Sequence, residues 1–233
     1  VDVRYDTSGK RGFDNVIHLT STGSDVYQGS LPAGIFTAEG MEYYILVSDT
    51  KGKERRTPSD DGYYSIKAEV GNFVSKNEVK GGSEQNAYRM ISVPFILTAQ
   101  TVAVQFQDMK PTGNPPLDWR LFRFSEGKPD PDEYPNIEPF TPGVAFWLLS
   151  KNNYTPRMSQ GTTISTTEPF TITLAPGWND IANPWMFDIS WNDVENPSNA
   201  NISKPYFYEG SWSDPTSSSR IIKPWTGISV NNL

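Results

Sequence analysis

The stretch 174–185 constrains the fold most strongly, because it reads as two strands joined by a tight turn. Apolar residues alternate with threonines over 170–174, which is the period of a half-buried strand. Pro176 and Gly177 favour a type II turn, since proline presets φ at the first central position and glycine accepts the positive φ of the second. We therefore expect a second strand that starts at Trp178 and ends near Asn183, before a proline.

A similar pattern occurs earlier in the chain and predicts an internal duplication of residues 87–233. The block 88–95 parallels 178–185, since each is an apolar strand closed by proline and an aromatic residue. Two further pairs of blocks keep the same order, 121–127 with 205–210 and 137–147 with 222–230. Three matches in order favour a duplicated β unit over coincidence.

Composition excludes several classes of partner. The 233 residues carry 20 Lys and Arg against 27 Asp and Glu, a net charge of −7, and the longest basic run is 51–56. Nucleic acid is therefore not an expected partner. Apolar runs are far shorter than the roughly 18 to 20 residues of a membrane span, so no membrane insertion is expected. The absence of cysteine excludes disulfides and thiolate sites.

The turn signals divide the chain into short strands and predict an all-β fold of two domains. Residues 1–70 are expected to form a partial sandwich, 71–86 a polar linker, and 87–233 a second β-sandwich with the internal pseudo-repeat. In the first domain the expected strands are 1–5, 13–20, 26–30, 41–48, 54–57 and 63–70.

Residues 26–32 and 41–52, with Tyr5 and Phe13 upstream, carry a family resemblance. They are similar to bacterial Ig-like or fibronectin type III-like modules, which implies a β-sandwich over residues 1–70. A full module has about 100 residues. The first domain is therefore expected to be incomplete, with an open sheet position.

We expect that open position to be covered by Phe73–Val74 or by a neighbouring molecule. The second domain, through 119–123, 134–137 and 142–147, resembles a β-rich module that follows Ig-like repeats in large secreted bacterial proteins. The resemblance implies neighbouring domains of a longer chain and an extracellular or cell-surface location. It implies no activity.

All seven tryptophans lie in the second domain. Trp191 and Trp212 fall outside the repeated blocks and are the candidates for exposed rings that stack on glycans. The other tryptophans inside blocks or strands are expected to fill the sandwich core, as large aromatic residues usually do: Trp119, Trp147, Trp178 and Trp225.

The acidic residues Asp130, Asp132 and Glu133 are candidate calcium ligands, because carboxylate oxygens suit hard cations. Their spacing matches no EF-hand loop, and the neighbouring prolines favour a solvated surface loop as the alternative. No other cofactor is expected.

Catalytic residues are harder to find. A carboxylate pair for glycoside hydrolysis could come from Asp188, Asp193 and Glu195, although turn and edge positions explain them equally well. The single histidine, His18, is expected to be exposed, and a catalytic triad would have to use it. The sequence therefore favours a non-catalytic spacer, adhesion or anchoring module of an exported protein, with possible partners among glycans and cell-surface proteins. A carbohydrate-binding module is the second interpretation and an enzyme the third.

Overall fold

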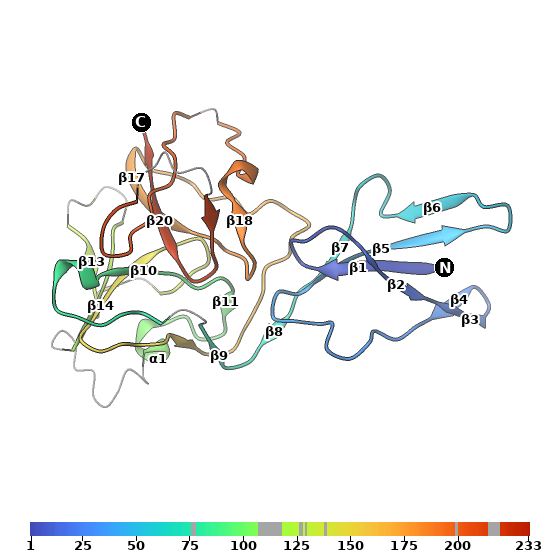
Figure 1. Cartoon of the computed structure of the whole chain (residues 1–233), viewed down its shortest axis with the longest axis horizontal. Coiled ribbons are helices and arrows are strands. Elements are labelled where there is room, and N and C mark those ends of the chain that lie inside the picture. Colours follow the sequence, from blue (N-terminus) through green and yellow to red (C-terminus); the bar gives the residue numbers. More distant parts are fainter. Residues whose placement is uncertain are drawn as a thin grey trace. The chain divides into compact units, whose positions relative to one another are not determined.

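The computed structural model confirms the all-β class (Figure 1). It describes residues 1–75, 78–106, 118–125, 128, 130–137, 139–198, 200–213 and 220–233. Helical structure in these ranges is limited to three short elements: α1 (Val102–Gln105) and the 3-10 turns η1 (Gln85–Ala87) and η2 (Trp191–Asp193). None of the helices in these ranges is long and apolar enough to cross a membrane.

The chain forms two compact units. The smaller unit contains Val1–Glu69 and Thr163–Phe170, and the larger unit contains Val70–Thr162 and Thr171–Leu233. The sequence-based boundaries differ from these, because they assigned 163–170 to the second domain and treated 71–86 as a linker.

The smaller unit is built on an antiparallel sheet in the order β2-β1-β5-β6, with β7 pairing with the other end of β5. A separate hairpin joins β3 and β4. The Ig-like or fibronectin-like topology stays a prediction. Six strands overlap the expected ranges: β1 (Asp2–Thr7), β2 (Asn15–His18), β4 (Val26–Gln28), β5 (Met41–Ser48), β6 (Glu54–Thr57) and β7 (Tyr64–Ile66). β3 (Thr20–Gly23) was not expected, since only its first residue falls within the predicted strand 13–20.

A later segment, Thr163–Phe170, returns to this sheet. Ala68 N–H donates to the Thr163 hydroxyl at 2.8 Å, and Thr163 N–H donates to the Ala68 carbonyl at 3.0 Å. The Tyr63 hydroxyl also donates to the Thr166 carbonyl. The segment that joins the smaller unit from elsewhere in the sequence is therefore Thr163–Phe170, and not Phe73–Val74 as expected.

The predicted linker is part of the larger unit. β9 (Phe73–Val74) pairs with β15 (Arg157–Met158), and Val79 forms a β-bridge with Tyr154. The polar composition of this segment reflects an edge strand. The remaining short strands are β8 (Glu69–Val70), which contains the boundary between the units, β11 (Ile96–Leu97), β16 (Gly161–Thr162), β18 (Ile189–Ser190) and β19 (Ile221–Ile222).

The first half of the larger unit contains a sheet in the order β10-β14-β12-β13, with all pairs antiparallel. Its strands are β10 (Arg89–Ile91), β12 (Trp119–Arg123), β13 (Asp132–Glu133) and β14 (Phe146–Ser150). β14, the last of these strands in the sequence, therefore lies between β10 and β12.

The second half repeats this order. β17 (Gly177–Ala182) pairs antiparallel with β20 (Gly227–Asn232), and Tyr206 forms an antiparallel bridge with Ser229 on the other side of β20. Tyr208 forms an antiparallel β-bridge with Trp212, which corresponds to the pairing of β12 with β13 in the first half. The repeated strand order supports the predicted duplication.

The expected strand at 170–174 is absent, although the turn and the strand after it are present. Gly177 has a φ of 89° and opens β17. Residues 171–174 alternate between exposed and half-buried as predicted, but they join no sheet. Side-chain amides bind this backbone instead: Asn232 donates to the Leu174 carbonyl at 3.4 Å, and Asn179 bonds both polar groups of Ala175 at 2.9 Å.

We predict that Ile228→Ala lowers the free energy of unfolding by about 2 to 5 kcal/mol, because Ile228 is fully buried against Ile222 and Val230. Ile221→Ala is the matched control, since Ile221 is 40% exposed. Urea unfolding measures both. Equal effects of the two substitutions would contradict the packing described for β20.

Candidate functional site

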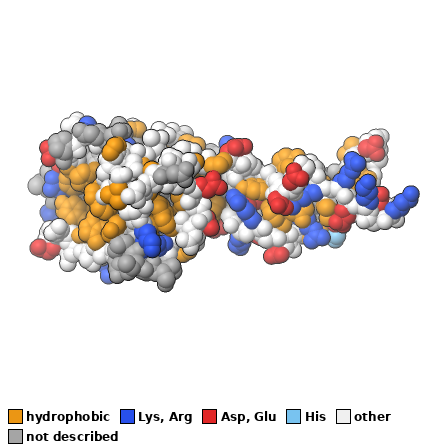
Figure 2. Space-filling view, turned by 90° about the horizontal axis from the view of Figure 1, so that it is seen from above, with side chains coloured by type: hydrophobic (Ala, Val, Ile, Leu, Met, Phe, Trp, Pro, Cys, Tyr) orange, Lys and Arg blue, Asp and Glu red, His pale blue; other side chains and the backbone are white. Residues whose placement is uncertain are grey.

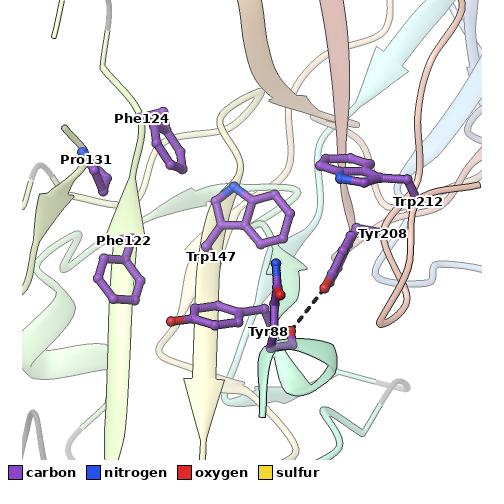
Figure 3. A pocket seen from close by; sticks show the side chains of 8 residues that line it. Tyr88, Phe122, Phe124, Pro131, Trp147, Tyr208 and Trp212 are labelled. Atoms are coloured by element: carbon purple, nitrogen blue, oxygen red, sulfur yellow. Dashed lines mark hydrogen bonds between the residues drawn. The ribbon is translucent and has the colours of Figure 1, made fainter. Parts of the chain in front are cut away.

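An open pocket of about 300 Å³ lies on the larger unit. Hydrophobic side chains also reach the surface of this unit (Figure 2). We call the cavity the aromatic pocket, because six of its eight lining side chains are aromatic: Gln85, Tyr88, Phe122, Phe124, Pro131, Trp147, Tyr208 and Trp212. Trp147 lies in the middle, between Phe122, Phe124 and Pro131 on one side and Tyr208 and Trp212 on the other (Figure 3).

Strand alternation explains the first wall. Along β14, Phe146 and Leu148 are fully buried, so Trp147 between them projects from the opposite face. Phe122 of β12 lies directly across from Trp147 in the ladder and shares that face. The Tyr88 ring completes this wall, with its centroid 6.0 Å from that of Phe122 and 6.5 Å from that of Trp147.

The second half of the larger unit supplies the second wall. The Tyr208 and Trp212 ring centroids lie 5.1 and 5.7 Å from that of Trp147. The Tyr208 hydroxyl donates to the Gln85 carbonyl at 3.0 Å (Figure 3). Gly210, which lies between Tyr208 and Trp212 in the sequence, has a φ of 93°, and a Cβ there would lie 2.8 Å from the Asn86 carbonyl oxygen. The turn that presents Trp212 therefore requires glycine.

The carboxylate of Asp180 accepts a hydrogen bond from Trp147 and fixes the orientation of its ring. The Trp147 Nε1–H donates to Asp180 Oδ2 at 2.7 Å, and the Ser229 hydroxyl donates to Asp180 Oδ1. Burial raises the pKa of Asp180 above its usual value, and these two hydrogen bonds offset part of that shift. Asp180 therefore orients a pocket wall and does not itself line the pocket.

The structure separates the two tryptophans predicted to stack on glycans. Trp212 lines the aromatic pocket and is 50% exposed. Trp191 belongs to η2 and packs, partly buried, against the cluster around Ile222 and Ile228. Only Trp212 is thus placed with other aromatic rings around a cavity.

Two of the four tryptophans assigned to the core are not buried. Trp119 and Trp225 are buried as predicted, whereas Trp147 lines the aromatic pocket and Trp178 is 59% exposed. The sequence signal for Trp147 is its position between Phe146 and Leu148, because alternation along a strand puts Trp147 on the face opposite to these two buried residues. Tyr88, Phe124 and Tyr208, which also line the pocket, were not singled out as site residues.

Two of the three candidate calcium ligands have basic or hydroxyl partners. Lys128 Nζ lies 2.7 Å from Asp132 Oδ1, and with the Ser125 hydroxyl it holds the pKa of Asp132 below its usual value. Arg120 donates to both oxygens of Glu133 at 2.7 and 2.8 Å. Asp130 is exposed. Within the described ranges, no group of three or more His, Cys, Asp or Glu side chains could hold a metal ion.

The catalytic candidates lie outside the aromatic pocket. Asp188, Asp193 and Glu195 are all exposed, and none of them lines the cavity. The side chain of His18 is 81% exposed, as predicted, and its Nδ1 lies 2.8 Å from Asp2 Oδ1. That hydrogen bond holds the pKa of Asp2 below its usual value.

Comparison with protein family models finds no match to this chain, and comparisons with curated proteins and with solved structures find none either. The two resemblances, over residues 1–70 and 87–233, therefore remain predictions that rest on their own motifs.

We predict that Asp180→Asn is at least as stable as the original chain at pH 7. The amide oxygen still accepts from Trp147, and no ionised group is desolvated. Because the folded pKa of Asp180 is raised, its protonation stabilises the original chain as the pH falls toward the ordinary aspartate value. The advantage of the variant should therefore shrink with falling pH.

Urea unfolding at several pH values between 4 and 7 measures this difference, with Asp193→Asn as an exposed control. A stability difference that does not change with pH, or a variant clearly less stable at pH 7, would show that desolvation does not dominate at Asp180.

We expect EDTA to change the melting temperature by less than about 2 °C, the order of shift that 0.5 to 1 kcal/mol gives for a chain of this size. The reason is that Asp132 and Glu133 are already neutralised by Lys128 and Arg120. Differential scanning calorimetry with and without added calcium measures it. A melting temperature many degrees lower in EDTA would instead support Asp130, Asp132 and Glu133 as calcium ligands.

Proposed function

We propose that the chain is a non-catalytic adhesion module of a larger exported or cell-surface bacterial protein, and that its aromatic pocket binds a neutral sugar. The observation that carries the proposal is the pocket itself, where Trp147, Tyr208 and Trp212 meet Tyr88 and Phe122 around an open cavity. The export and bacterial origin rest on the family resemblance.

The chemistry of the lining fits a sugar. Aromatic rings offer apolar faces to the C–H faces of a sugar ring. The Gln85 amide and the Tyr88 hydroxyl are groups of the kinds that form hydrogen bonds with sugar hydroxyls. The volume lies at the lower end of the range for small-molecule sites, about 300 to 1,000 Å³. One or two sugar units are therefore a suitable occupant.

The ring geometry supports enclosure of the ligand. Trp147 is inclined at 67° to Tyr208 and at 77° to Trp212, so these rings form walls. A row of coplanar rings would instead offer a flat platform suited to the face of a crystalline polymer. The pocket is better suited to a soluble glycan.

The charge distribution favours binding over hydrolysis. None of the described side chains that line the pocket is ionisable near neutral pH. Glycoside hydrolysis generally uses two carboxyl groups at a fixed separation across the scissile bond. Asp180, the carboxylate that contacts the lining residue Trp147, is occupied by Trp147 and Ser229, and Glu133, which lies across from Phe122 in the ladder, is paired with Arg120.

A glycan array tests the proposal. We expect binding to neutral glycans and loss of at least tenfold in affinity for Trp212→Ala and Phe124→Ala, since both rings are about half exposed and line the pocket. Phe36→Ala is the matched control, because Phe36 is 45% exposed and belongs to the smaller unit.

Calorimetric titration of a glycan that binds gives the affinities. No binding to any neutral glycan, equal weakening by Phe36→Ala, or binding of a proline-rich peptide in place of glycans would contradict the proposal.

A further inference from the structure

The aromatic surface continues beyond the pocket. The ring centroid of Tyr206 lies 6.4 Å from that of Trp212, and Trp178 follows with its centroid 5.2 Å from that of Tyr206. Trp178 is 59% exposed and is the most exposed of the seven tryptophans, all of which lie in the described ranges. Neither Tyr206 nor Trp178 lines the cavity.

Strand register explains why these rings share a face. Trp178 and Asp180 are two residues apart on β17, so their side chains project to the same side. Asp180 reaches the pocket residue Trp147 from that side. Ser229 lies opposite Asp180 in the ladder and is bridged by Tyr206 on its other side. The row Trp178, Tyr206 and Trp212 therefore crosses β20 toward the aromatic pocket.

A large exposed indole next to a binding pocket is suited to a second stacking contact. Trp178 packs edge-on against Tyr206, with 75° between the ring planes, so part of the indole surface stays open to solvent. A ligand held only in the pocket would not need this ring. A longer ligand that leaves the pocket past Trp212 would reach it.

We infer that Trp178 forms a second subsite, so that the protein binds an extended neutral oligosaccharide and not a single sugar unit. This inference rests on the proposed function, because the pocket provides the first subsite. Affinity then rises with chain length until the ligand spans from the pocket to Trp178. Because the second contact is independent of the first, loss of Trp178 affects long ligands and spares short ones.

The test is calorimetric titration with four neutral series of two to six sugar units: cello-, xylo-, manno- and chito-oligosaccharides. In at least one series we expect affinity to rise with length. Trp178→Ala should lower the affinity for the six-unit ligand about fivefold to tenfold and that for the two-unit ligand less than about twofold. Trp178→Phe, which keeps an aromatic face, should retain most of the long-ligand affinity.

Thermal unfolding of Trp178→Ala checks that the exposed substitution leaves the fold intact. Binding that does not depend on length, or that falls equally for short and long ligands, would overturn the second subsite and leave sugar binding by the pocket in place. No binding by any series at any length would contradict the proposed function and, with it, this inference.

Discussion

Reciprocal backbone hydrogen bonds join the two halves of the larger unit. Ser92 N–H donates to the Trp225 carbonyl at 3.1 Å, and Ala182 N–H donates to the Gly143 carbonyl at 3.0 Å. Ser92 and Ala182 occupy equivalent places in the blocks 88–95 and 178–185. The end of the first strand in each half therefore donates a hydrogen bond to the last block of the other half, 222–230 or 137–147. Neither half satisfies these backbone groups alone. The aromatic pocket depends on this exchange, because its walls come from both halves.

Local signals were sufficient for much of the fold. The turn residues that divide the chain predicted the strands at 41–48 and 54–57, and the proline and glycine before Trp178 predicted the start of β17. The return of Thr163–Phe170 could not be predicted in this way, because Ala68 and Thr163 are 95 residues apart and bond through a single hydroxyl and one carbonyl. Non-local pairing of this kind leaves no periodic trace in the sequence.

The site was predictable only in part. Trp212 could be singled out because it lies outside the repeated blocks. Trp147 was assigned to the core because aromatic residues in strands are usually buried, although its neighbours Phe146 and Leu148 already occupy the inner face of β14. The approach of Tyr208 to Trp147 depends on the packing of one half against the other, which no local pattern encodes.

The position of the charges limits what the pocket can select. The chain carries a net charge of −7, yet none of the described side chains that line the pocket is charged near neutral pH. Arg120 lies 4.6 Å from the Phe122 ring centroid and is paired with Glu133, while Asp180 is bonded to Trp147. An anionic ligand would meet overall repulsion, and a cationic one would find no carboxylate on the walls. Selection therefore depends on ring stacking and on the fit of hydroxyl groups, which favours uncharged ligands with both apolar faces and hydrogen-bonding edges.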